Sequence, residues 1–347
     1  MSIPDIDPAE DLRYVLGGYP ATPLIECPGL SARANVDQVY LKAEWVRPLG
    51  NFKSLGGMFA GLRALARAGG AASIAELLEG KAPRRALPPL ICASDGNHGL
   101  AVAAAAKRAG AEASIYLAAG VGRTRIERIV AQGAKVVLIA GTYDDAVDAA
   151  EKSAARGEGL LVQDTTRDPG DIVIRDVMEG YSLIARELIE QFRGDVRAQP
   201  THVFIQAGVG GLAAAIARGL AGSMQAECKW LVVEPASAAC VARGLAAGHP
   251  VRIPGALETS AAMLSCGLAS APALGILRSL GAVSVVVDES RLREATNVLR
   301  EVAGIDSTPS GAAGLAGLLH LASQSEQRLS HGLDSKSRVL LLITEGP

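Results

Sequence analysis

The 347-residue chain has little of several features that mark particular classes of protein. Its five cysteines are odd in number, widely spaced and without a C-x-x-C pair, which argues against a disulfide framework and against a zinc site. Aromatic residues make up only 3% of the chain, so small and aliphatic side chains supply most of its apolar content. We therefore expect reduced, mostly buried thiols, no metal centre, and helices packed closely on sheets.

A strong charge of either sign is also missing. The chain has 34 basic and 36 acidic residues, and its net charge of -2 provides no broad field for nucleic acid or an anionic membrane. Residues 1–13 are acidic and lack the apolar core of a secretory signal, and no stretch is long and apolar enough to span a bilayer. These absences predict a soluble, cytoplasmic protein with no nucleic-acid or membrane partner.

Short apolar runs alternate with amphipathic segments along most of the chain. The apolar runs predict strands at residues 39–44, 90–93, 114–117, 135–139, 160–163, 202–206, 230–233, 284–287 and 339–343. The three- and four-residue spacings predict helices at residues 54–68, 100–109, 123–132, 143–156 and 176–192. This alternation is typical of parallel sheets with right-handed crossovers. Because the length exceeds what one core usually holds, we expect either an α/β protein of two parallel-sheet lobes, with a ligand in the cleft between them, or one large α/β unit.

Two connecting segments stand out by composition. Residues 19–24 include two prolines and read as extended chain, because the residue before a proline is pushed out of the helical region. Residues 323–337 are polar and rich in serine, which predicts an exposed loop.

Lys53 stands between the aromatic Phe52 and the apolar, glycine-rich residues 54–58. A solvated lysine has a pKa of about 10 and is neither a nucleophile nor a proton carrier at neutral pH, whereas apolar neighbours favour the neutral amine. A neutral lysine can form a Schiff base with an aldehyde cofactor, and pyridoxal phosphate is the cofactor that we expect here. The alternative is a helix-start lysine that buries its stem and keeps its amine in water.

Four loops follow predicted strands, at the sheet edge where ligands bind in parallel α/β folds. Residues 94–99 place an acid, an amide and an imidazole at the start of a predicted helix. This loop either binds an anion such as a substrate carboxylate or only caps the helix. Residues 206–212 form a glycine turn that suits a phosphate or merely packs helix on strand, and it is neither a P-loop nor a dinucleotide motif. Asp164 and Thr344 end the other two strands, where they are functional or ordinary turn residues.

Taken together, these stretches resemble the fold-type II family of pyridoxal phosphate-dependent enzymes, whose fold is like that of tryptophan synthase β. Within this family the diaminopropionate ammonia-lyases are the most similar. The resemblance covers nearly the whole chain and rests on residues 21–24, 51–57, 95–99, 143–147, 162–165, 207–211 and 344–346. It implies a homodimer with a large cofactor-binding domain, residues 1–53 and 162–347, and a smaller α/β domain, residues 54–161, inserted in it.

The resemblance also implies a role for each site residue. Lys53, next to Phe52, is the Schiff-base lysine, Asn97 faces the phenolic oxygen of the cofactor, and Thr344 faces its pyridine nitrogen. The cradle of the cofactor phosphate is formed by Gly208, Val209, Gly210, Gly211 and Leu212. The proton-handling carboxylates are Asp95 and Asp164, and the substrate contacts are Ser94, Asp95, His98 and Tyr143.

Asp95 determines which substrate we expect. As the resemblance has it, the serine and threonine dehydratases of the family carry a small neutral residue in its place. A carboxylate there can pair with a second ammonium on the β-carbon of the substrate and can pass protons. We therefore expect an enzyme of amino-acid catabolism that eliminates the β-amino group of 2,3-diaminopropionate, D, L or both, to give pyruvate and ammonia.

Two rival functions stay open. Residues 308–314 look more like the dehydratases, which favours a serine, threonine or 3-hydroxy amino acid dehydratase, or a β-replacement synthase of the same fold. A catalytically idle carrier of the cofactor is the alternative outside the enzymes, and the presence of Lys53, Asp95 and Asp164 argues against it.

Overall fold

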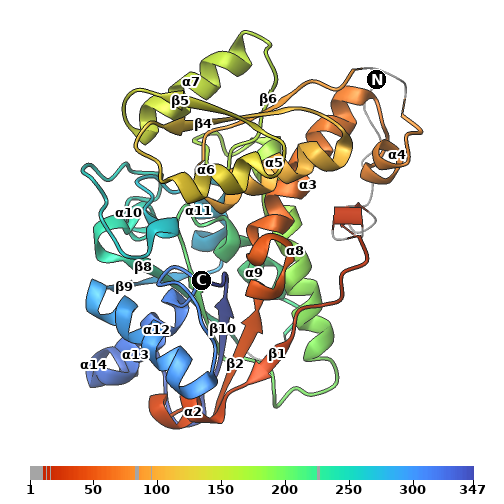
Figure 1. Ribbon diagram of the computed structural model, residues 1–347. Coiled ribbons are helices and arrows are strands. Elements are labelled where there is room, and N and C mark those ends of the chain that lie inside the picture. The colour runs from red at the N-terminus through yellow and green to blue at the C-terminus, as the bar shows by residue number, and fades with distance from the viewer. Residues whose placement is uncertain (1–10, 13, 16, 83–85, 95, 225–226) are drawn as a thin grey trace. The chain divides into compact units, whose positions relative to one another are not determined.

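The computed structural model describes residues 11–12, 14–15, 17–82, 86–94, 96–224 and 227–347 (Figure 1). The chain folds into two compact units. The first unit comprises the N-terminal stretch up to Pro20, Lys53–Asp164 and Asp171–Leu183, and the second comprises Ala21–Phe52, Thr165–Gly170 and Ile184–Pro347. The domain division expected from the sequence, with residues 54–161 inserted in 1–53 and 162–347, stays a prediction. In the described part of the chain, no helix is both long enough and apolar enough to cross a membrane.

A parallel sheet of short strands lies in the first unit. Its order among the described residues is β5-β4-β3-β6, and the strands are β3 (Leu90–Cys92), β4 (Ala113–Ala118), β5 (Lys135–Ile139) and β6 (Leu160–Leu161). The helices of this unit are α3 (Lys53–Gly69), α4 (Ile74–Leu78), α5 (Asn97–Ala109), α6 (Arg123–Val130) and α7 (Tyr143–Ala155). The strands and helices expected from the apolar spacing are confirmed here, with shifts only at their ends.

Small residues let α3 and α5 lie very close together. A Cβ atom added at Gly57 would lie 2.6 Å from the Cβ atom of Ala101, and one added at Gly61 would lie 2.8 Å from the Cβ atom of Ala105. Such distances are too short for two carbon atoms, so the absence of a side chain at both glycines is what allows the contact. The alanine-rich sequence of α5 therefore serves packing as well as helix propensity.

The second unit contains a sheet that is parallel except at one edge. The order of its described strands is β1-β2-β10-β7-β8-β9, and β1 (Leu24–Glu26) is antiparallel to β2 (Gln38–Ala43). The other strands are β7 (His202–Gln206), β8 (Lys229–Pro235), β9 (Val283–Val287) and β10 (Arg338–Ile343). β10, in blue, lies between β2 and β7, and its Val339 is paired with Val39 (Figure 1). The extended segment expected at residues 19–24 thus leads into an antiparallel edge strand.

Helices cover this sheet, some of them directly and others by packing on those helices. The helices of this unit are α2 (Pro28–Ala34), α9 (Gly211–Leu220), α10 (Cys240–Ala247), α11 (Ala271–Ser279), α12 (Glu289–Ala303), α13 (Ala313–Ser323) and α14 (Ser325–Ser330). A long helix, α8 (Ile172–Gln191), begins in the first unit and ends in the second. On α13, Leu315 and Leu318 are fully buried in one cluster with Phe204 of β7 and Val233 of β8. The apolar strands are therefore buried by the helices, as expected for a largely parallel sheet.

The exposed loop expected at residues 323–337 is wrong in part, because this stretch contains α14. Arg328 fixes the helix by donating a hydrogen bond of 2.7 Å to the carbonyl oxygen of Ala34, at the end of α2. A second bond runs from its guanidinium to the carbonyl oxygen of Asn35. The helix is thus held by contacts with a segment far away in the sequence, which local composition does not reveal.

Candidate active site

The segment that leads to Lys53 is irregular and tightly constrained. After β2 the chain forms two 3₁₀ turns, Glu44–Val46 and Pro48–Gly50, and Leu49 and Gly50 both have positive φ angles, of 68° and 75°. The backbone N–H of Phe52 then donates to the carbonyl oxygen of Thr344 at 3.1 Å. A left-handed leucine is costly, so surrounding contacts have to hold this backbone in place.

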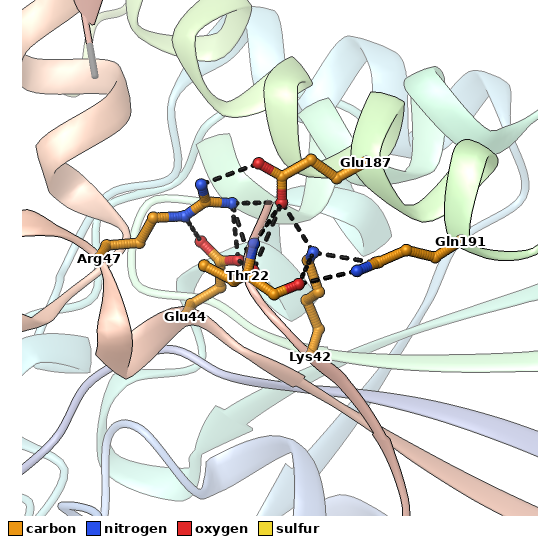
Figure 2. Close-up of polar contacts among 6 residues, drawn as sticks. All are labelled: Thr22, Lys42, Glu44, Arg47, Glu187 and Gln191. Atoms are coloured by element: carbon orange, nitrogen blue, oxygen red, sulfur yellow. Dashed lines mark hydrogen bonds and ion pairs between the residues drawn. The ribbon is translucent and has the colours of Figure 1, made fainter. Parts of the chain in front are cut away.

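A buried ionic network supplies those contacts (Figure 2). We call it the Glu187 network, and its members are Thr22, Lys42, Glu44, Arg47, Glu187 and Gln191. Arg47 donates to Glu44 at 2.8 Å and to Glu187 at 2.6 Å, and Lys42 donates to Glu187 at 2.7 Å. Burial would raise the pKa of the Glu187 carboxyl, but Arg47 and Lys42 outweigh it and the pKa is lowered. Glu187 is therefore charged at neutral pH.

The Glu187 network ties three parts of the second unit together. Lys42 comes from β2, Glu44 and Arg47 come from the irregular segment, and Glu187 comes from the last turns of α8. Lys42 and Arg47 balance Glu44 and Glu187 in charge, and Lys42 and Glu44 have no exposed surface. The backbone before Lys53 therefore has a rigid, charge-balanced base, which suits a residue that must be placed accurately.

In the first unit, Lys53 begins α3 and pairs with Asp164, just after β6. The Nζ atom of Lys53 donates to Oδ2 of Asp164 at 2.5 Å, and the two side chains are 18% and 21% exposed. Burial would raise the pKa of Asp164, but the charges of Lys53 and His98 and the hydrogen bond from Lys53 lower it to about 2. Asp164 is thus a carboxylate at all physiological pH values, paired with a lysine whose side chain is partly exposed.

His98, on the first turn of α5, lies close to this ion pair. Its Nε2 atom lies 3.1 Å from the carbonyl oxygen of Val162, to which the Nε2–H form donates. Burial lowers the pKa of the imidazole although Asp164 favours its charged form, so His98 is neutral at pH 7. Among the described residues its Nδ1 atom has no hydrogen-bond partner. A buried polar atom of this kind is normally satisfied, so a ligand or water is expected to complete it.

The loop before α5 was expected to hold the substrate carboxylate. Asn97 is the first residue of the helix and is buried, and the Oγ atom of Ser94 accepts from the backbone N–H of Gly96 at 3.4 Å. The N-terminal cap of α5, Gly96, provides no side-chain hydrogen bond to the first helical turn. Asp95, expected here as a catalytic and substrate-binding residue, lies outside the described residues.

The glycine turn of the second unit joins β7 to α9. Gly210 has a φ angle of 91° and caps α9, again without a side-chain hydrogen bond to the first turn. The Sγ–H of Cys240 donates to the carbonyl oxygen of Gly208 at 3.1 Å, and the N–H of Ser270 donates to that of Val209 at 2.9 Å. The turn is thus held from outside, while the first amides of α9 carry no side-chain cap and suit a phosphate.

Thr344 follows β10 in the same unit and is buried. Its Oγ1 atom accepts a hydrogen bond of 2.8 Å from the side-chain amide of Gln206, so the hydroxyl hydrogen is directed elsewhere. That hydrogen suits an aromatic nitrogen acceptor such as a pyridine. Tyr143, an expected substrate contact, begins α7 and is 52% exposed.

The expected site residues thus fall into two groups. Lys53, Asp164 and His98 come together in the first unit, and the glycine turn and Thr344 belong to the second. Each group fits pyridoxal phosphate: the first offers a partly exposed lysine beside a carboxylate, and the second offers an uncapped helix start and a hydroxyl donor. The roles given to these residues stay predictions.

Tyr181, on α8, is a residue that the sequence reasoning missed. It is 2% exposed, its ring lies against Gly56 of α3, and Lys53 is close enough to act on the pKa of its phenol. The sequence shows it only as one apolar position in the helix expected at residues 176–192, so no pattern marks it. Its proximity to Lys53 depends on the tertiary packing of two helices.

The chain is similar to known pyridoxal phosphate-dependent enzymes along most of its length. The family model described as "Pyridoxal-phosphate dependent enzyme" matches residues 15–345. The diaminopropionate ammonia-lyase of Escherichia coli K12 is 30% identical over 350 residues, which cover 97% of this chain and 87% of that enzyme. A probable D-serine dehydratase of Burkholderia thailandensis is 31% identical over 339 residues, which cover 90% of this chain and 74% of that protein.

A solved structure gives the same result for the fold. The crystal structure of the Escherichia coli diaminopropionate ammonia-lyase with an aminoacrylate-pyridoxal phosphate intermediate superposes with a TM-score of 0.84. The match has 29% sequence identity and covers 98% of this chain and 88% of that one. The expected α/β fold with parallel sheets is therefore confirmed. The chain belongs to the pyridoxal-phosphate dependent enzymes and has the fold of their fold-type II members.

Proposed function

We propose that this protein is a pyridoxal phosphate-dependent ammonia-lyase that converts 2,3-diaminopropionate and water into pyruvate and two molecules of ammonia. The observation that carries the proposal is the ion pair of Lys53 and Asp164, which puts an amine and a permanently charged carboxylate at one point. The likeness to diaminopropionate ammonia-lyase over 97% of the chain supports the substrate.

The cofactor would be held by Lys53, by the glycine turn at residues 208–212, by Asn97 and by Thr344, with Phe52 beside the lysine. When bound, pyridoxal phosphate supplies an electron sink for the charge that develops at the α-carbon of an amino acid. The cofactor phosphate suits the start of α9, where the helix dipole is positive and Gly210 leaves the amides uncapped. These assignments follow the family resemblance, and the separate geometry of each unit supports them.

We assign the proton transfers of the reaction to side chains of this protein. Lys53 in its neutral form takes the proton from the α-carbon, and Asp164 stabilises the ammonium that results. The β-amino group leaves as ammonia: in its ammonium form it takes the electron pair of the C–N bond and needs no further proton, so a carboxylate that keeps it protonated and in place favours the elimination. We assign this role to Asp95, which also pairs with the β-ammonium of the bound substrate.

Further contacts complete the proposal. Ser94 and His98 belong to the loop and first turn that would bind the substrate carboxylate, and the vacant Nδ1 atom of His98 supports a polar ligand there. Tyr143 is proposed as a weaker substrate contact. We propose that the enzyme acts in the cytoplasm as a homodimer, with residues 54–161 as a smaller domain inserted in 1–53 and 162–347.

Dehydration of serine, threonine or a 3-hydroxy amino acid is the second candidate. The 31% identity with a probable D-serine dehydratase over 90% of the chain favours it, as does the dehydratase-like segment 308–314. The two reactions differ only in the leaving group, since a hydroxyl replaces the β-amine. The residue at position 95 is therefore the most informative place to separate them.

The deciding experiment compares substrates on the purified protein. The visible absorbance of the bound cofactor is followed while D- and L-2,3-diaminopropionate, D- and L-serine and L-threonine are added, and the oxo acid is measured with a coupled dehydrogenase. We expect oxo acid from diaminopropionate and none from serine or threonine. An Asp95→Ser variant should lose turnover of diaminopropionate and keep the cofactor absorbance. Turnover of a hydroxy amino acid instead would refute the ammonia-lyase.

A further inference from the structure

Two glycines bring α3 and α8 into backbone contact just beyond Lys53. A Cβ atom added at Gly180 would lie 2.7 Å from the Cα atom of Gly56, and one added at Gly56 would lie 2.5 Å from the Cζ atom of Tyr181. Neither gap admits a methyl group, so a side chain at either position would push the helices apart. The crossing therefore fixes the ring of Tyr181 against the first turn of the helix that Lys53 begins.

Tyr181 places a polar side chain near Lys53. Its ring lies against Gly56, one turn beyond Lys53 in α3, and Lys53 is close enough to act on the pKa of its phenol. The tyrosine is 2% exposed. Burial raises the pKa of the Tyr181 phenol to about 12, although Lys53 favours the phenolate. The phenol therefore stays neutral at physiological pH, and its oxygen lone pairs accept a hydrogen bond from an ammonium.

The other titratable groups around Lys53, in the part of this unit that the structure describes, come from three elements. Asp164, after β6, accepts from Lys53 at 2.5 Å. His98 of α5 is neutral because burial lowers its pKa, and Cys92 of β3 keeps its proton because burial raises its pKa. Asp164 thus supplies negative charge from one side, while Tyr181 supplies a neutral acceptor from α8.

We propose that Tyr181 is a positioning residue for proton transfer by Lys53: its hydroxyl accepts a hydrogen bond from the Lys53 ammonium and, with Asp164, fixes that ammonium for proton transfer. The inference rests on the proposed function for the identity of the substrate, but the hydrogen bond between Tyr181 and Lys53 does not depend on which amino acid is consumed. A hydrogen bond to Asp164 fixes the ammonium in one direction. A second acceptor on another helix fixes it in a second direction and stabilises the protonated lysine that proton abstraction produces.

Tyr181→Phe deletes the hydroxyl and keeps the ring between the helices. In the full-length protein freed of cofactor, the acetylation of Lys53 by acetic anhydride is followed against pH by mass spectrometry. We expect the profile to move to lower pH by about one unit, because the ammonium has lost an acceptor. In the loaded enzyme, we expect kcat to fall about ten- to a hundredfold with KM unchanged. We also expect a larger isotope effect with substrate deuterated at the α-carbon.

Tyr40→Phe is the matched control. Tyr40 is also a buried tyrosine, but it lies on β2 in the second unit, where its ring packs edge-on against Phe192 at 5.4 Å. Removal of its hydroxyl should leave the acetylation profile of Lys53, and both kcat and KM, as in the wild type. A shift in this variant as large as in Tyr181→Phe would mean that general loosening is responsible, and it would overturn the proposal.

A second pair of variants covers the case in which Tyr181→Phe does not fold. Gly56→Ala forces the Tyr181 ring away from α3 with the hydroxyl intact, and Gly61→Ala creates a similar clash with Ala105 farther along the same helix. We expect the acetylation shift in the first and not in the second. A wild-type profile in both Tyr181→Phe and Gly56→Ala would overturn the inference. If the wild type consumes no diaminopropionate, the proposed function fails, and the acetylation profile still decides the role of Tyr181.

Discussion

Replacing Glu187 by glutamine removes one of the two carboxylates that balance Lys42 and Arg47 in the buried Glu187 network. The carboxylate accepts hydrogen bonds from Lys42 at 2.7 Å, from Arg47 at 2.6 and 2.9 Å, and from the backbone N–H of Thr22 at 3.2 Å. The amide of a glutamine would turn two N–H donors toward these donors and would leave one positive charge uncompensated. Breaking one partner of a buried ion pair costs about 3–5 kcal/mol, and we expect a loss of that size.

Urea unfolding followed by tryptophan fluorescence measures this loss in the right part of the protein. The chain has two tryptophans, Trp45 and Trp230, and both lie in the second unit with the network. Glu190→Gln is the control, because Glu190 is also on α8 but pairs with Arg193 at the surface, where both side chains are more than half exposed. This change should cost less than about 1 kcal/mol.

A double variant tests whether charge balance is the cause. Adding Lys42→Met to Glu187→Gln removes one cation together with one anion and leaves Arg47 paired with Glu44. We expect the double variant to be more stable than the sum of the two single losses implies, by about 1 kcal/mol or more. Additive losses, or a loss below about 1 kcal/mol in Glu187→Gln alone, would refute the reasoning.

Three further changes test other parts of the structure. Glu234 is buried, and burial raises its pKa from 4.5 to about 7 despite hydrogen bonds from Ser284 and two backbone amides. Its contribution to stability is therefore complete below pH 4.5 and is lost as pH rises through about 7. Glu234→Gln should therefore flatten the fall of Tm over that range, and an unchanged slope would contradict the assignment. Asp164→Asn should lower turnover about a hundredfold or more while the cofactor absorbance is kept, and turnover within tenfold of the wild type would rule out its role with Lys53. Gly210→Ala should cost about 1–2 kcal/mol because its φ is 91° and should also weaken cofactor binding, whereas Gly222→Ala, at a φ of 82° in open space, should cost stability alone.

The sequence predicted the elements well because the strands are short, apolar and fully buried runs. β7 and β10 carry three and five buried apolar residues, and polar residues mark their ends. Lys53 and Asp164 were predicted to act in one site from their places at element ends and from the family resemblance, and the structure brings them into contact across 111 positions of sequence.

The Glu187 network and the position of Tyr181 could not be predicted in this way. Lys42 and Glu187 are 145 positions apart, and each reads locally as one more charged side chain on a strand or helix. Tyr181 reads as a core residue, because only the close approach of Gly56 and Gly180 brings its ring against the helix that Lys53 begins. Burial of charge and helix crossings depend on which distant segments meet, and periodicity contains no information about that.

The central place of β10 has a consequence for how the protein is made. β2 and β7 do not pair with each other; β10 lies between them and matches residue 39 with residue 339. During synthesis at about 5–20 residues per second, β2 therefore waits tens of seconds for its neighbour. Over that time the segment before Lys53 lacks the partner that fixes Phe52, so the hydrogen bond from Phe52 to Thr344 forms only after β10 has left the ribosome. Chaperones that shield open sheet edges are expected to matter most in this interval.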